Sequence, residues 1–142
     1  MISTTHFHPM LVHFPIALVA FGFIAEIAAL YFKKEICFTK MGFYLLIFGT
    51  LSALIAWLTG NFFTAEMAGS AGEIKEMHEL FASVTLGTLL VTSALRIGLL
   101  TKKNVTSGIK WVAFVLYGLA AISVSVTGFY GGTLVYNYMM SL

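Results

Sequence analysis

Four long apolar segments, separated by short polar stretches, dominate the chain. They run from Pro9 to Phe32, from Met41 to Phe63, from Glu76 to Thr101 and from Lys110 to Tyr130. Each is long enough for an α-helix to cross a bilayer, which takes about 20 residues. The pattern predicts an all-α fold, an up-down bundle of four transmembrane helices that forms one domain over residues 1–142. We expect Gly131 and Gly132 to interrupt the last helix, so that Thr133 to Leu142 either continue it or lie along the surface.

Composition supports a membrane protein and excludes several other classes. Hydrophobic residues make up 59% of the chain and charged residues 10%, whereas soluble domains carry about 25% charged residues. A net charge of +2 is too small to indicate nucleic-acid binding. The single cysteine, Cys37, excludes an internal disulfide. The first five residues lack the positive charges of a signal peptide, so we expect the N-terminus to be retained.

The charges between the segments predict an orientation. The first and third connections are basic, with Lys33, Lys34 and Lys40 in one and Lys102, Lys103 and Lys110 in or beside the other. The middle connection is acidic, with Glu66 and Glu73 against Lys75. Cytoplasmic loops of membrane proteins carry an excess of lysine and arginine. We therefore expect both termini and the middle connection on the outer, periplasmic side of a bacterial inner membrane.

This orientation gathers the ligand-type side chains at the outer end. All four histidines belong there: His6, His8, His13 and His78. Six of the seven methionines belong there too: Met1, Met10, Met67, Met77, Met139 and Met140. The inner end carries lysines and aromatic residues but no comparable set of donors.

Two histidines that begin different helices at one membrane face suit a b-type haem, whose iron takes an imidazole on each side. The sequence favours His13 and His78 as this pair, because His13 lies further into its apolar segment than His8. Small residues would let the backbone approach a porphyrin, and Gly131 and Gly132 are the expected contacts. Gly60, Gly87 and Gly128 are further small residues of this kind.

Helical depth gives a different order for the two N-terminal histidines. Glu26 and Arg96 are charges inside long apolar segments, so we expect them to pair at one level of the membrane. His8 precedes Glu26 by 18 positions and His78 precedes Arg96 by 18, a whole number of turns at about 100° per residue. His8 would then be level with His78, although Pro15 is expected to kink the first helix and disturb this register.

Two other functions remain open. Imidazole and thioether ligands together select Cu(I), so His6, His8, Met10 and Met77 could form a copper site, or a zinc site, in a binding or transport protein. The histidines could instead only orient helix ends in a structural subunit without a cofactor. A zinc hydrolase is disfavoured, because the chain has no His-Glu-x-x-His motif.

The first motif resembles a known family. The run His8-Pro9-Met10-Leu11-Val12-His13-Phe14-Pro15-Ile16-Ala17-Leu18 is similar to the HPxxVHFPIAL motif that opens the bacterial membrane family DUF2231. The similarity continues at Glu26, at Leu58-Thr59-Gly60, from Gly72 to Glu79 and from Gly131 to Tyr136. It implies a four-helix inner-membrane protein that often occurs fused to, or near, c-type cytochrome domains. Members often carry a histidine where this chain has Tyr138, so that ligand would be missing here.

Together these observations predict a small b-type haem protein that transfers electrons at the outer face of the membrane, as a carrier and not as a catalyst. The bilayer is its expected environment. A second copy of the chain, a respiratory complex or a c-type cytochrome is its expected partner.

Overall fold

A computed structural model describes residues 7–64, 66–102 and 106–138 of the chain, and every regular element in these ranges is an α-helix. A short helix, α1 (Phe7–Leu11), precedes four long ones: α2 (His13–Tyr31), α3 (Ile36–Phe63), α4 (Ser70–Thr101) and α5 (Ser107–Asn137). Each long helix is apolar and long enough to cross a membrane, with the first span running from His8 to Tyr31. The predicted four-helix membrane fold is therefore confirmed.

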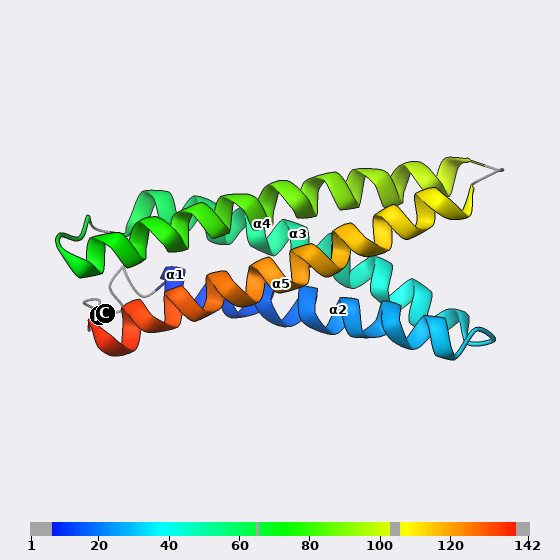
Figure 1. Cartoon of the computed structure of the whole chain (residues 1–142), viewed down its shortest axis with the longest axis horizontal. Helices are drawn as coiled ribbons and strands as arrows, with labels where there is room; N and C mark the ends of the chain where they lie inside the picture. The colour runs from blue at the N-terminus through cyan, green and yellow to red at the C-terminus, as the bar shows by residue number, and fades with distance from the viewer. Residues whose placement is uncertain (1–6, 65, 103–105, 139–142) are drawn as a thin grey trace.

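The long helices run up and down along one axis (Figure 1). The connections α2–α3 and α4–α5 lie at one end of the bundle, while α1, the α3–α4 connection and the end of α5 lie at the other. We call the latter the α1 end. Helix α2 packs mainly against α3, and α4 mainly against α5, while α2–α5 and α3–α4 contacts join the two hairpins.

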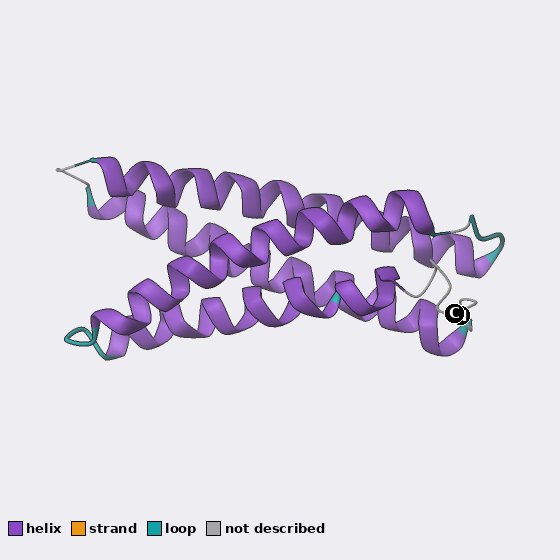
Figure 2. Ribbon diagram, turned by 180° about the vertical axis from the view of Figure 1, so that it is seen from behind, coloured by secondary structure: helices purple, strands orange, loops and turns teal. Residues whose placement is uncertain are grey.

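The break between α1 and α2 falls at Val12, which Figure 2 shows as a short loop within the first span. Pro15 explains its position, because proline has no N–H to donate to the carbonyl of Leu11 and its ring crowds that carbonyl. The observed effect at this position is a one-residue break, across which Val12 keeps helical dihedral angles and its amide donates to the His8 carbonyl at 3.1 Å.

The interior is narrow and closely packed. Val19, Leu46, Leu89, Tyr117 and Ala120 are almost fully buried and belong to one core cluster. Large apolar side chains such as Phe21, Phe48 and Ile122 face outward, as expected for helices whose surroundings are lipid. The helices therefore pack against one another through a narrow buried interface of mostly small and medium-sized residues.

Three predicted boundaries are wrong. Helix α3 begins at Ile36 and not at Met41, so Lys40 lies within this helix. The Gly131–Gly132 pair does not interrupt the last helix, which continues to Asn137. A glycine inside a helix costs only about 1 kcal/mol relative to alanine, and a hydrophobic environment leaves the backbone no other hydrogen-bond partner. Helix α4 also begins at Ser70 and not near Glu76. Gly69, with a φ of 65°, ends the preceding connection, and the Gly69 carbonyl accepts a bond from the Glu73 amide at 3.2 Å.

Candidate cofactor site

The imidazole rings of His8 and His78 lie together at the α1 end. Their centroids are 6.1 Å apart and their planes are nearly perpendicular, at 83°. His8 comes from α1 and His78 from the third turn of α4. Residues 70 positions apart in the sequence thus meet because the bundle returns the chain to the same end twice.

His8 is held by a hydroxyl group of α3. Its Nδ1 lies 3.2 Å from Thr59 Oγ1, and the Thr59 hydroxyl donates its own proton to the Ala56 carbonyl at 2.9 Å. A hydroxyl has one proton to donate, so the His8 Nδ1–H must be the donor in the first bond. Nε2 of the neutral ring then carries the lone pair. His8 is only 9% exposed, so packing and this hydrogen bond together restrain its ring.

His78 is held in the equivalent way by α5. Its Nδ1 lies 3.0 Å from the Thr127 carbonyl oxygen, which can only accept, so this nitrogen also carries the proton. Metal-binding histidines commonly donate one N–H to a carbonyl or carboxylate, and this bond fixes the ring and presents the other nitrogen to the metal. His8 and His78 both have this arrangement.

Two glycines make room for the rings. A Cβ atom on Gly60 would lie 3.0 Å from His8 Cε1, and one on Gly131 would lie 3.1 Å from His78 Cε1. Gly131, a predicted cofactor contact, therefore lies directly against a candidate ligand. A Cβ on Gly132 would meet nothing within 4 Å, although Gly132 lines the cavity described next.

Both rings line one cavity of about 550 Å³, within the usual range of about 300–1,000 Å³ for small-molecule and cofactor sites. Its apolar walls include Ile16, Ala53 and Val124. The site therefore combines two fixed imidazoles with a largely apolar cavity at the α1 end of the bundle.

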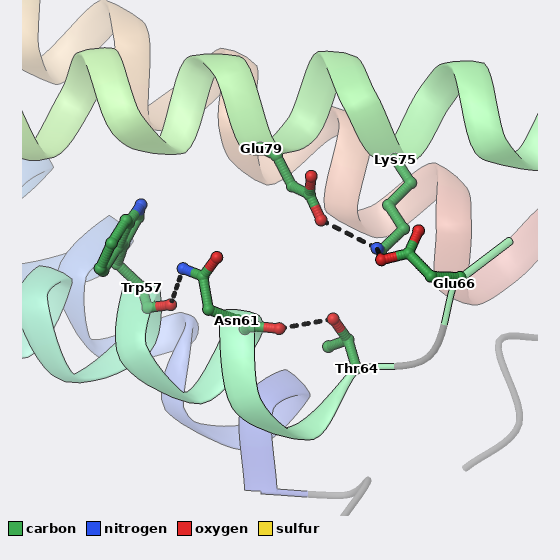
Figure 3. Close-up of polar contacts among 7 residues, drawn as sticks. Trp57, Asn61, Thr64, Glu66, Lys75 and Glu79 are labelled. Atoms are coloured by element: carbon green, nitrogen blue, oxygen red, sulfur yellow. Dashed lines mark hydrogen bonds and ion pairs between the residues drawn. The ribbon is translucent and has the colours of Figure 1, made fainter.

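Polar side chains of α3 and α4 face each other along another wall of this cavity (Figure 3). The Trp57 indole N–H donates to Ser83 Oγ at 3.1 Å. One to two turns closer to the N-terminus of α4 than Ser83, the Lys75 ammonium lies 2.9 Å from Glu79 Oε1. Lys75 lies in α4, although the sequence pattern predicts a loop there and gives no sign that this lysine belongs to the site. Its spacing of three residues from His78 would have indicated a shared helix face if the start of α4 had been recognised.

Three other predicted ligands are placed differently. His13 also lines the cavity, but its ring is exposed and its Nδ1 donates to the Pro9 carbonyl at 2.8 Å. Met10 and Met77 are 63% and 38% exposed, and neither lines the cavity. His6, the remaining candidate, lies outside the described residues. Within the described ranges, no three His, Cys, Asp or Glu side chains are grouped as a metal site.

Glu26 and Arg96 form an ion pair between α2 and α4, as the isolated charges predict. A Cβ on Gly42 of α3 would lie 2.9 Å from Glu26 Cγ, so this glycine makes room for the carboxylate. Tyr117 of α5 is buried nearby and donates to the Gly42 carbonyl at 3.4 Å. All four long helices therefore meet around this pair, far from the histidines.

Comparison with known proteins gives one match. The model of a family described as "Predicted membrane protein (DUF2231)" matches residues 4–141. No curated protein and no solved structure matches the chain.

Proposed function

Since the chain belongs to the DUF2231 family of predicted membrane proteins, we propose that it is a membrane-bound b-type haem protein in which His8 and His78 would hold the haem iron. One observation carries the proposal: two imidazoles from different helices lie 6.1 Å apart on the wall of one apolar cavity.

The spacing suits a shared iron. An imidazole nitrogen binds a metal ion at about 2 Å, so two rings with centroids 6.1 Å apart could both reach one ion. Both rings use Nδ1 for their hydrogen bonds to Thr59 and Thr127, which leaves Nε2 for the metal. The residues present therefore fit a bis-histidine haem.

The donor set favours haem over a copper or zinc site. A porphyrin supplies four ligands of its own, so two histidines complete the coordination of its iron. A structural zinc ion takes four protein ligands, and a Cu(I) site would need the thioethers. Met10 and Met77 do not line the cavity, so neither of these thioethers supports a Cu(I) site beside His8.

Haem in this site would supply reversible one-electron chemistry, and the chain would hold it at one end of the bundle. Thr59 and Thr127 would orient the ligands, and the apolar walls would limit access of water. We place this end at the outer face of a bacterial inner membrane, because the opposite end carries most of the lysines: Lys33, Lys34, Lys40, Lys102 and Lys110, and cytoplasmic ends are rich in lysine. Electron exchange would then occur with a c-type cytochrome, a respiratory complex or a second copy of this chain.

An absorbance spectrum of detergent-purified protein from haem-supplied cells tests the proposal, with metal analysis of the same sample. We expect a sharp Soret band, split α and β bands after dithionite reduction, and about one haem per chain or per dimer. His8→Ala and His78→Ala should each lose the low-spin spectrum. His13→Ala, the matched control from the same motif, should keep it.

Each other outcome has a defined meaning. A featureless spectrum would overturn the haem assignment, and copper or zinc in that sample would favour a metal-binding protein. Loss of the spectrum in His13→Ala with retention in His8→Ala would replace His8 by His13 as the ligand. No cofactor at all, with the three variants altered only in stability, would favour a structural subunit.

A further inference from the structure

A buried lysine lies beside the two histidines. Lys75 is 7% exposed, and its ammonium contacts Glu79 Oε1 at 2.9 Å and Glu66 Oε1 at 3.3 Å (Figure 3). Lysine is rarely this buried without a specific partner. Among the described residues that line the cavity, it is the only lysine or arginine.

Lys75 lies nearer to the α1 end of the bundle than His78. The two residues are three positions apart on α4, so they share a helix face with an axial offset of about 4.5 Å. The offset points toward the N-terminus of α4. A positive charge therefore lies between the candidate ligand and this end of the bundle.

The two carboxylate partners of Lys75 are not equivalent. Glu79 lies on the same helix, one turn along, and holds the ammonium from α4 itself. The Glu66 side chain belongs to the α3–α4 connection and is 96% exposed. An ion pair to so exposed a group contributes little stability. Glu66 is thus the partner that another carboxylate could replace.

From this placement we propose that Lys75 binds a carboxylate of the cofactor, exchanging Glu66 for a propionate group of the haem. This inference rests on the proposed function. A porphyrin of this class has an apolar macrocycle and two carboxylates on one edge. The apolar walls around His8 and His78 receive the macrocycle, and Lys75 forms a charge-assisted hydrogen bond to the carboxylate edge. Glu76 and Glu79 also line the cavity, so among the described lining residues Lys75 is the one lysine or arginine that favours this negative charge.

Titration of haem and of haem dimethyl ester into the full chain, purified without haem, tests the inference. The ester has the same macrocycle and iron but no carboxylate charge. Wild type should bind haem about tenfold more tightly than the ester, the expected effect of one charge-assisted hydrogen bond. Lys75→Met should lose this preference by weakening haem binding alone, and Lys75→Arg should keep it. Lys33→Met, an exposed lysine at the opposite end, should behave as wild type.

Glu66→Gln separates carboxylate exchange from a structural ion pair. If Glu66 only competes with the propionate, this variant should bind haem at least as tightly as wild type. Equal binding of haem and ester by wild type, or equal loss of both in Lys75→Met, would overturn the role of Lys75 while leaving the haem site intact. Binding of neither compound by wild type would overturn the proposed function itself.

Discussion

At the scale of single residues, the candidate site depends on two glycines that lie against the histidine rings. A Cβ atom on Gly60 would lie only 3.0 Å from His8 Cε1, and one on Gly131 only 3.1 Å from His78 Cε1. Contacts of that length are tighter than ordinary packing allows, so an alanine must displace the ring. These glycines therefore fix where the imidazoles lie.

Gly131→Ala should weaken haem binding by about tenfold or more, the usual cost of disturbing groups that orient a metal ligand. Gly87→Ala is the matched control, because it is also a glycine within a long helix but a Cβ there meets nothing within 4 Å. The control should keep haem affinity and raise stability by about 0.5–1 kcal/mol. Haem titration and thermal unfolding of both variants check this. Equal haem affinity in the two variants would show that the Gly131 contact does not position His78.

The sequence identifies the histidines as a group but not which of them meet. The spacing of His8 from Glu26 and of His78 from Arg96 puts the two rings level, in agreement with their separation of 6.1 Å. Preference for His13 followed from its depth in the apolar segment, yet the structure brings His8 to His78. The direction in which Pro15 turns α1 depends on packing against α3, and no local pattern encodes that packing.

At the scale of helices, the Glu26–Arg96 pair joins α2 to α4, two elements that otherwise touch little. The carboxylate is buried, with the Glu26 side chain 8% exposed and the Arg96 side chain 15% exposed. Removing one partner of a buried pair leaves an uncompensated charge, which costs more than the pair contributes over two neutral residues. The pair thus sets the register of the helices more than it adds stability.

Glu26→Gln should lower the free energy of unfolding by about 3–5 kcal/mol, because it leaves the Arg96 guanidinium unpaired. The double variant Glu26→Gln/Arg96→Met should regain most of that loss. Thermal unfolding in detergent measures both. Haem binding of the folded variants should be unchanged, since 18 helical residues separate Arg96 from His78, or about 27 Å. Additive losses in the double variant would show that the two side chains are not coupled.

Helix number and direction follow from the apolar segments, but the helix ends do not. Gly131 and Gly132 are turn signals in water, where a broken helix can bond to solvent. In α5 the helix continues through them, because lipid offers the backbone no substitute partner. The start of α4 at Ser70 depends on the single positive φ at Gly69. Because this start is not predicted, Lys75 is assigned to a loop, and the helix face that it shares with His78 is not recognised from the sequence.

At the scale of the whole molecule, the two ends differ in chemistry. The end opposite the cavity carries Lys33 and Lys34 between α2 and α3 and Lys40 in the second turn of α3, with Lys102 and Lys110 beside the α4–α5 connection. The α1 end carries the candidate ligands His8 and His78 and the cavity that they line. The positive-inside tendency therefore predicts that this end faces the outer side of the membrane.

Cys37 provides a direct measurement of this orientation. It is the single cysteine of the chain, it is exposed, and it lies in the first turn of α3 at the lysine-rich end. A membrane-impermeant maleimide should label it in inverted membrane vesicles and leave it unmodified in intact spheroplasts. Cys37→Ser/Ser70→Cys moves the thiol to an exposed position at the start of α4 and should show the reverse pattern. Labelling of Cys37 in spheroplasts would instead put the cavity on the cytoplasmic side, where a periplasmic cytochrome could not reach it.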